Sequence, residues 1–316
     1  MNKRHSILAI WFFVVFVIQV FHTYDPTVNY EIFLEMENSK YAEITGQKID
    51  ELINLGEQTE NFPNMNRKEY IVFFHAAHFD VVKAHAMIVQ HYALRTEMPE
   101  IFNRDNTDPE LSELDQAKRV MSHSILFSDS YQTTRGHVGY RYVYFRFIDK
   151  DPAHFVFIHQ VRYFFYMIKC MLIEYGTFDG LVVIVNGEGF KLWHFLKFNL
   201  RLLLPLKKLI QDAPPTRIKN IYILNTNRFM KWAYNIAKPY LSPDLVQKIV
   251  LCLQDSNAVY NGVDGVPRTI MPINGYKNGL GPNYEVQAST TYALMERFHN
   301  RYGPNTDDRA HEIRVM

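Results

Sequence analysis

Basic side chains are concentrated in one stretch of the chain, between residues 191 and 248. The whole protein has a formal net charge of +1, but in this stretch the only acidic residues are Asp212 and Asp244. A local excess of positive charge on a nearly neutral protein indicates a surface that binds an anion. Phospholipid headgroups and nucleic acid are the usual anions, and a purely solvated run of charges is the alternative. The basic residues are Lys191, Lys197, Arg201, Lys207, Lys208, Arg217, Lys219, Arg228, Lys231, Lys238 and Lys248.

A helix predicted from Asn227 to Lys238 lies inside this basic stretch. Its helical spacing gathers apolar residues on one side and polar residues on the other, with Trp232 and Tyr234 at the boundary. Such a helix can lie on an anionic membrane or close over an apolar ligand, and an ordinary surface helix packed on a sheet has the same pattern. The apolar face holds Phe229, Met230, Ala233, Ile236 and Ala237, and the polar face holds Arg228, Lys231, Asn235 and Lys238.

Residues for catalysis or metal binding are weakly represented. His75 and His78, joined by either His85 or His91, lack a carboxylate or a third ligand at fixed spacing, so no metal site is predicted. Gly187-Glu-Gly189 does not have the spacing of a dinucleotide-binding loop, and no nucleophile triad is recognisable. The sequence therefore favours binding without covalent chemistry and without a cofactor, and an α/β enzyme remains the competing class.

The elements around the basic stretch alternate between strand and helix. Short apolar runs rich in β-branched residues predict buried strands, and prolines such as those after Asp212 end the helices. This alternation predicts an α/β fold with right-handed crossovers and a mostly parallel sheet. The predicted strands are Tyr140–Phe147, taken as the first of the sheet, Gly180–Val185, Ile218–Leu224 and Lys248–Leu253. The predicted helices of this part are Ala153–Tyr175, Leu192–Ile210, Asn227–Lys238 and Tyr284–Tyr302.

The N-terminal third is predicted to be helical. Apolar residues recur at helical spacing between Ala42 and Leu55, and Asp80 is a suitable N-cap for a following helix. Residues 103–136 are polar and form the expected connecting segment, with some helix around Leu111 to Ser122. Composition is 47% hydrophobic and 15% aromatic, which suits either an ordinary core or the wall of an apolar cavity. Cys170 and Cys252 lie in apolar runs and are expected to be buried thiols.

Three segments of the chain together resemble the CRAL-TRIO lipid-binding domain, the fold of the α-tocopherol and retinaldehyde carriers. They are Gly180–Gly189, Gln211–Asn225 and Ala237–Ser242, and their order and spacing match the family over about seventy residues. Tyr70–Ala84, continuing to Tyr92–Phe102, resembles the helical segment that precedes the domain in this family. The resemblance implies an apolar cavity under the sheet, closed by a mobile gate helix at Asn227–Lys238, and a carrier of lipid or another hydrophobic small molecule.

The resemblance also implies residue roles. Phe229, Met230, Ala233, Ile236 and Ala237 would face the ligand, and Trp232 and Lys231 would contact the membrane. In the tocopherol carrier, basic residues beside the gate bind phosphoinositide headgroups, and Arg217, Lys219 and Lys248 fall at such positions. Asp244 falls at a position that is basic in the family, where an acid opposes an anionic headgroup. Asn186-Gly-Glu-Gly also departs from the family, and Gly187 is expected to loosen this turn.

The N-terminus raises a separate question. Lys3-Arg-His5 precedes an apolar run from Ile7 to Phe21, which fits a signal peptide, a membrane anchor or a misassigned start. The family resemblance favours a cytoplasmic protein that associates peripherally with phosphoinositide-containing membranes and has no nucleic-acid partner. An anchored lipid sensor or adaptor without transfer activity is the alternative. The predicted division is an apolar segment 1–24, a helical domain 25–110, a connecting segment 111–136, a lipid-binding domain 137–303 and a tail 304–316.

Overall fold

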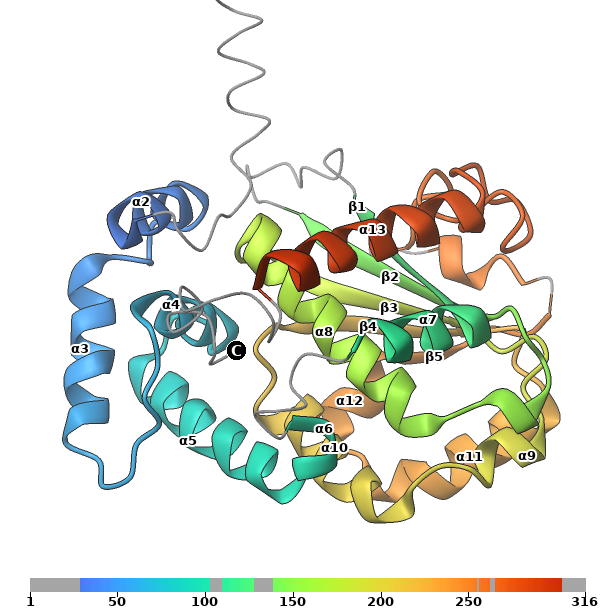
Figure 1. Ribbon diagram of the computed structural model, residues 1–316, viewed down its shortest axis with the longest axis horizontal. Coiled ribbons are helices and arrows are strands. Elements are labelled where there is room, and N and C mark those ends of the chain that lie inside the picture. Colours follow the sequence, from blue (N-terminus) through green and yellow to red (C-terminus); the bar gives the residue numbers. More distant parts are fainter. Residues whose placement is uncertain (1–28, 103–109, 128–138, 255, 262–264, 303–316) are drawn as a thin grey trace, which may run out of the picture.

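The protein is built around a sheet of five strands in the order β1-β2-β3-β4-β5 (Figure 1). The computed structural model describes residues 29–102, 110–127, 139–254, 256–261 and 265–302. β2 to β5 pair in parallel, and β1 is antiparallel to β2. The fold is therefore the predicted α/β class with a mostly parallel sheet. The strands are β1 Met121–Phe127, β2 Tyr140–Phe147, β3 Gly180–Asn186, β4 Ile218–Leu224 and β5 Ile249–Leu251.

The strand register sorts the side chains onto two faces, because successive residues of a strand point to opposite sides. One face carries two apolar rows across the sheet, Val143–Val183–Ile221–Ile249 and Phe145–Val185–Ile223–Leu251. We call this the helix face, since α8 (Phe157–Tyr175) packs on it through the ring pair Phe145 and Phe164, whose centroids are 5.8 Å apart. The opposite face carries the row Tyr144–Ile184–Tyr222–Val250.

The opposite face is covered by the segment between β5 and the last helix. Val259, Ile270 and Met271 of this segment form one apolar cluster with Val182 and Ile184 of β3. The last helix, α13, lies against β1, where Thr291 accepts a hydrogen bond from the Ile125 backbone at 2.8 Å. The remaining helices of this half are α7 Leu111–Val120, α8 Phe157–Tyr175, α9 Leu192–Phe195, α10 Leu200–Asp212, α11 Arg228–Ala237, α12 Pro243–Lys248 and α13 Tyr284–Tyr302; 3₁₀ turns occupy η2 Pro152–His154, η3 Lys238–Tyr240 and η4 Ala258–Tyr260.

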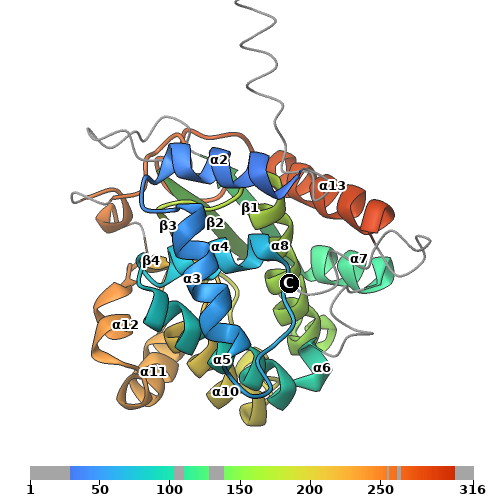
Figure 2. The same cartoon turned by 90° about the vertical axis from the view of Figure 1, so that its left-hand side faces the viewer.

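The N-terminal helices stack at one end of the sheet (Figure 2). Their starts are fixed by side-chain caps: Asn66 and Glu69 form a capping box, and Asp80 accepts from the Lys83 backbone at 3.0 Å, as predicted. Ile71, Phe74 and other residues of these helices join the same apolar cluster as α8 and the helix face. The helices are α2 Tyr30–Lys40, α3 Gly46–Glu57, α4 Arg67–Ala76, α5 Val81–Glu97 and α6 Pro99–Phe102.

A buried polar contact fixes α2 to the turn that follows α8. The Glu37 carboxylate is fully buried and accepts hydrogen bonds from the Thr177 backbone at 3.2 Å and from Lys40 Nζ at 2.7 Å. Gly176 has a φ of +67°, and a Cβ there would lie 2.1 Å from Glu37 Oε1. Only glycine therefore fits this close approach of α2 to the turn.

Several predicted elements need correction. Tyr140–Phe147 is not the first strand, because β1 precedes it. Ser122, His123 and Ser124 make β1 look polar, although all three side chains are buried. The helix expected over Leu192–Ile210 is two helices, since the chain restarts at Asn199, whose side chain accepts from the Arg201 backbone at 3.2 Å.

Other predicted ranges change at their ends or lie outside the described residues. The strand expected at Lys248–Leu253 is only Ile249–Leu251, the helix expected from Ala42 begins at Gly46, and α8 begins at Phe157 after a 3₁₀ turn. The apolar segment 1–24, the tail 304–316 and parts of the connecting segment are outside the described residues, and the division into domains stays a prediction. No single described helix is long and apolar enough to cross a membrane. By length and composition, α4 and α5 are sufficient only as a pair, and the two helices are bent by 109° relative to each other.

Candidate functional site

The helix face of the sheet is incompletely covered beyond β2. In β3, Val182 and Ile184 on the opposite face are 1% and 0% exposed. Their neighbours Val183 and Val185 on the helix face are only half-buried. The same is true of the residues that continue these two rows, Ile221 and Ile223 of β4 and Ile249 and Leu251 of β5. A strip of apolar side chains is thus accessible on the half of the sheet formed by β3, β4 and β5.

Helix α11, at the predicted gate, begins at the carboxyl end of β4. The chain turns at Asn225, which has a φ of +50°, and Asn227 then caps the helix by accepting from the backbones of Phe229 and Met230 at 3.0 Å. Asn227 Nδ2 also donates to the Phe190 carbonyl at 3.0 Å, which links the root of α11 to the loop after β3. None of the residues of α11, all of which are described, is buried.

The apolar face of α11 is therefore divided between a half-buried part and an exposed part. Met230 and Ala233 are half-buried, whereas Phe229 and Ile236 are 41% and 46% exposed, and Trp232 at the boundary of the face is 48% exposed. Met230 rests against Gly187, where an added Cβ would lie 2.0 Å from the Met230 sulfur. The missing side chain of Gly187 thus provides the space that Met230 occupies, a steric role that we did not predict.

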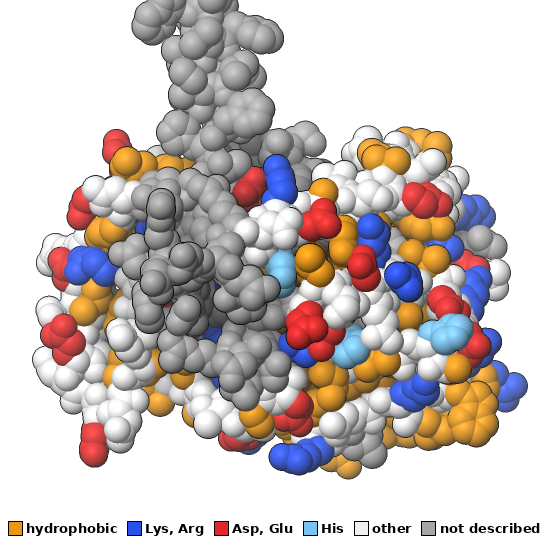
Figure 3. All heavy atoms as spheres, in the orientation of Figure 1, with side chains coloured by type: hydrophobic (Ala, Val, Ile, Leu, Met, Phe, Trp, Pro, Cys, Tyr) orange, Lys and Arg blue, Asp and Glu red, His pale blue; other side chains and the backbone are white. Residues whose placement is uncertain are grey.

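Exposed apolar side chains continue from α11 onto the neighbouring helices. Trp193 of α9, Leu196, Leu204 of α10 and Tyr240 of η3 are all more than half exposed. The Trp232 ring meets that of Phe195 at 5.6 Å, and Lys207 Nζ donates to the Tyr240 carbonyl at 2.6 Å. In Figure 3, apolar and basic side chains lie together at the lower right, where Figure 1 places α9 and α11. The sequence pattern missed this surface, because Leu192–Ile210 was interpreted as one long helix.

The three predicted headgroup residues lie in one groove. Arg217, Lys219 and Lys248 line an open groove of about 840 Å³. It lies between the N-terminal helices, the start of β4 and α12, and its other Lys, Asp, Glu and His lining residues are Lys40, Glu43, His78, Asp179 and Asp244. The groove thus contains both signs of charge, which the sequence had indicated only for Asp244.

The three basic residues differ in how they are held. Arg217 Nε donates to the His75 carbonyl at 2.9 Å, Nη2 donates to the same oxygen, and the guanidinium lies 5.0 Å from the Phe79 ring. Burial lowers the pKa of Arg217, so its charge lies in a partly desolvated position. Lys248 forms an ion pair with Asp244 at 2.7 Å, and Lys219 Nζ lies 5.3 Å from the Tyr140 ring centroid. Arg217 therefore joins the N-terminal helices to β4, and Asp244 compensates Lys248.

Three of the histidines considered for metal binding make contacts inside the fold, and the fourth, His78, is exposed. His75 is buried against the Tyr41 ring at 4.6 Å, and burial together with nearby Arg217 lowers its pKa to about 2. His85 contacts Thr59 Oγ1 at 2.8 Å, and His91 contacts the Ala213 carbonyl at 2.8 Å. Within the described part of the chain, no three His, Cys, Asp or Glu side chains are grouped as metal ligands.

Comparison with known proteins agrees with this architecture. The model of the CRAL/TRIO domain family matches residues 130–264, which include β2 to β5 and α11. The chain is therefore similar to the CRAL/TRIO domain over this stretch, and the predicted family resemblance is confirmed. A domain of this family implies binding of a lipophilic molecule.

The chain is similar to curated proteins named "Alpha-tocopherol transfer protein-like". Those of Pongo abelii and Homo sapiens are each 25% identical over 246 residues, covering 73% of this chain and 67% of the relative. That of Mus musculus is 24% identical over 225 residues, covering 66% of this chain and 61% of the relative. A solved structure titled "Crystal structure of Sfh5" is similar with a TM-score of 0.42 and 13% identity, covering 71% of this chain and 76% of that chain.

Proposed function

We propose that the protein holds a lipophilic molecule between the helix face of the sheet and α11, and exchanges it with a membrane by moving α11. The relatives' name suggests a ligand of the tocopherol kind. The protein would associate peripherally with the membrane and perform no covalent chemistry. The observation that carries the proposal is the uncovered pair of apolar surfaces: half-buried Val183, Val185, Ile221 and Ile223 on the sheet, and the residues of α11, none of which is buried.

Exposed apolar surface of this kind is unfavourable in water and favourable against lipid. Trp232, Phe229 and Ile236 on α11, together with Trp193 on α9, would enter the membrane interface, and Lys231 would remain at the headgroup level. A basic side chain near an anionic surface contributes on the order of 1 kcal/mol. Such docking would be weak and sensitive to salt, as a protein that must leave the membrane again requires.

The ligand site can be tested by filling the accessible strip. Val183→Trp places an indole on the helix face, and we expect native mass spectrometry to show loss of the copurified lipophile, with transfer of a fluorescent lipid between vesicles lowered at least tenfold. Val82→Trp is the matched control, because Val82 lies on the surface of α5 and is 71% exposed. Unchanged transfer by a folded Val183→Trp protein would contradict the proposal.

We further propose that the groove containing Arg217, Lys219 and Lys248 binds a phosphoinositide headgroup. Its mixed charge suggests that Asp244 opposes this binding by pairing with Lys248. Asp244→Asn is therefore expected to strengthen binding to phosphoinositide vesicles severalfold in flotation assays, and the double change Lys219→Gln/Lys248→Gln to weaken it. Arg217 is a poor test residue, since its removal also breaks the contact with His75. Equal binding by the wild type, Asp244→Asn and the double variant would refute this role of the groove.

A sensor without transfer activity makes a different prediction from a carrier. A sensor would retain its lipophile when it is mixed with acceptor vesicles, whereas a carrier would release it. Two-vesicle exchange with full-length protein separates these functions. Removal of residues 1–24 then tests whether the apolar N-terminal segment holds the protein on a membrane.

A further inference from the structure

The turn between α4 and α5 brings two ring side chains to the groove that contains Arg217, Lys219 and Lys248. His78 and Phe79 both line this groove, and their φ angles are +56° and +63°. Glycine is the usual residue in this left-handed conformation after a helix, and a residue with a side chain costs about 1–2 kcal/mol there. The turn therefore holds both rings at the groove in a backbone conformation that is unfavourable for them, which is typical of functional positions.

The hydrogen bonds that hold this turn also hold Arg217. The Phe79 backbone N–H donates to the Phe74 carbonyl at 2.9 Å, and that of His78 donates to the His75 carbonyl at 3.0 Å. The same His75 oxygen accepts from Arg217 Nε at 2.9 Å, and the Phe79 ring lies 5.0 Å from the guanidinium. The position of His78 is thus fixed relative to one of the predicted headgroup residues.

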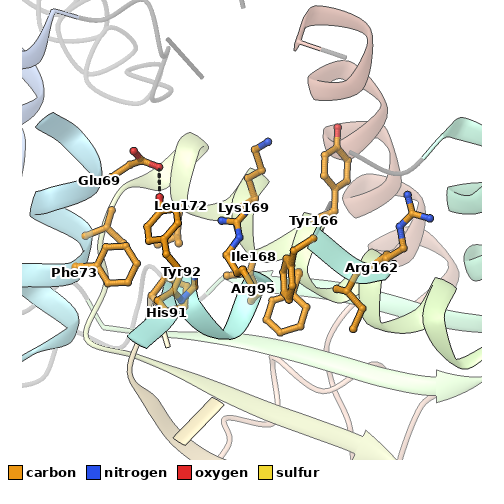
Figure 4. A pocket seen from close by; sticks show the side chains of 15 residues that line it. Glu69, Phe73, His91, Tyr92, Arg95, Arg162, Tyr166, Ile168, Lys169 and Leu172 are labelled. Carbon is orange, nitrogen blue, oxygen red and sulfur yellow. Dashed lines mark hydrogen bonds between the residues drawn. The ribbon is translucent and has the colours of Figure 1, made fainter. Parts of the chain in front are cut away.

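His78 differs from two nearby histidines, His75 and His91, in its access to water. Those two are buried, and burial is the main cause that lowers their pKa values to about 2 and about 3. His91 lies in a small cavity whose charged lining residues come from three helices and include Glu69, Arg95 and Lys169 (Figure 4). His78 is exposed, so it can exchange a proton with water and contact an anion in the groove.

The charges closest to His78 are positive. Partial burial lowers the pKa of His78, and the charges of Arg217, Lys248 and Lys83 lower it further. Lys83 is itself paired with Asp80 at 3.3 Å. In the ligand-free groove the imidazole is therefore mainly neutral at pH 7.

A bound phosphate would act on His78 in the opposite direction. A phosphomonoester carries a charge of about −1.5 to −2 at pH 7 and has three acceptor oxygens. An opposite charge within about 4–6 Å favours the protonated form of a histidine, whose two ring N–H groups can then both donate. The other charged or titratable side chains of the groove lining come from α2, β2, β4, α12 and two loops; they are Lys40, Tyr41, Glu43, Tyr140, Asp179, Lys219 and Asp244.

We propose that His78 binds a phosphomonoester group in this groove and takes up a proton from solvent when it does so. The inference rests on the proposed headgroup role of the groove and adds its regulation by pH. Binding would be stronger in slightly acidic than in slightly basic solution, and the proton would return to solvent when the phosphate leaves.

Isothermal titration calorimetry at pH 7, in two buffers with different enthalpies of ionisation, counts the protons taken up on binding. The probes are phosphatidylcholine vesicles that contain phosphatidylinositol bisphosphate, and soluble inositol trisphosphate. We expect proton uptake by the wild type and less uptake by His78→Asn, which keeps a residue that tolerates the left-handed conformation. His78→Lys keeps a cation and should bind without this uptake. The matched control is His154→Asn, since His154 is an exposed histidine of η2, paired with Asp149 outside the groove.

Affinity at two pH values gives a second readout. From pH 7.5 to pH 6, the affinity of the wild type for the vesicles should rise about threefold relative to that of His78→Asn. The comparison with the variant cancels the second ionisation of the phosphate itself, whose pKa is about 6. Each variant is first compared with the wild type by circular dichroism and thermal unfolding.

The outcomes separate this inference from the proposal on which it rests. Equal proton uptake and parallel pH profiles of the wild type and folded His78→Asn would overturn the role of His78 alone, if Lys219→Gln/Lys248→Gln still weakens binding. Unweakened binding by that double variant would overturn the headgroup role of the groove and this inference with it. Uptake with the vesicles identifies a lipid headgroup as the source of the phosphate, whereas uptake with the soluble probe alone identifies a free phosphate and contradicts docking through this groove.

Discussion

The two faces of β3 differ although their residues are nearly identical in type. Val182 and Ile184 are closed over by the segment that contains Val259 and Met271, whereas Val183 and Val185, on the helix face, stay half-buried. The covered face stabilises the fold, since each aliphatic side chain buried there contributes about 1.5–3 kcal/mol. The accessible face gives up part of that stabilisation and leaves apolar surface for a ligand to cover.

The largest expected effect contrasts one isoleucine from each face. Ile184→Ala should lower the free energy of unfolding by about 2–5 kcal/mol, because Ile184 is fully buried. Ile223→Ala, on the accessible face, should cost roughly 1 kcal/mol in ligand-free protein, since less apolar area is lost. Guanidinium denaturation of both variants measures the difference. Equal losses would mean that the two faces are equally covered.

The buried carboxyl group of Glu69 should make the stability of the fold depend on pH. The pKa of Glu69 is raised from 4.5 to about 8 in the folded protein, so the folded protein holds a proton that the unfolded chain has lost between these values. Its stabilising contribution is complete below about pH 4.5 and is lost as the pH rises through about 8.

The predicted slope is at most about 1.4 kcal/mol per pH unit. Urea denaturation at a series of pH values should show that Glu69→Gln removes this part of the dependence. Glu188→Gln, at an exposed ion pair, serves as the control. A wild-type slope that persists in Glu69→Gln would assign the dependence to another group.

The contact between Gly187 and Met230 tests how closely α11 approaches the sheet. Gly187→Ala places a Cβ 2.0 Å from the Met230 sulfur, so either the Met230 side chain or α11 must move. We expect a loss of about 1–2 kcal/mol in stability and faster ligand release in stopped-flow fluorescence. Gly46→Ala is the control, since its Cβ would make only an ordinary contact with Leu34 at 3.5 Å. Unaltered release would show that Met230 moves aside without α11.

The smallest effect is expected at the far end of α11. Lys207→Met removes the hydrogen bond to the Tyr240 carbonyl, an exposed contact at 2.6 Å. Stability should change by less than about 0.5 kcal/mol. Ligand release should become about twofold faster, because the contact, worth a few tenths of a kcal/mol at this surface, holds η3 and thereby the end of α11. Lys208→Met, at the exposed neighbour, should leave the release rate unchanged.

The sequence predicted correctly those helices and strands that are defined by their own residues and by the residues that flank them. Ile218–Leu224, Tyr140–Phe147 and Tyr284–Tyr302 have the predicted bounds, because apolar spacing and flanking breakers define them. β1 was missed, since Ser122 and Ser124 are buried by tertiary packing that no local pattern reports. At this strand, tertiary packing buries polar residues that the local sequence pattern marks as exposed.

The candidate site could be predicted from the sequence only in part, for the same reason. The basic residues Arg217, Lys219 and Lys248 could be located, but the contact of Arg217 with the His75 carbonyl depends on how the N-terminal helices dock. The pairing of Asp244 with Lys248 could have been read from their spacing of four residues on a helix. The cavity of Glu69, Arg95 and Lys169 could not, because its residues come from three helices.

The start of α11 is tied to the sheet, whereas its far end is tied to α10 through the contact of Lys207 with the Tyr240 carbonyl. Asn186 accepts from Asn225 Nδ2 at 2.8 Å and donates to the Gly275 carbonyl at 2.9 Å, which ties the start of the helix to the covered side of the sheet. At 1.5 Å per residue, the tip lies about 15 Å from this anchor. If α11 moves as proposed, a small rotation at Asn227 would displace Ile236 and Tyr240 the most, so the ligand site would open first beside η3.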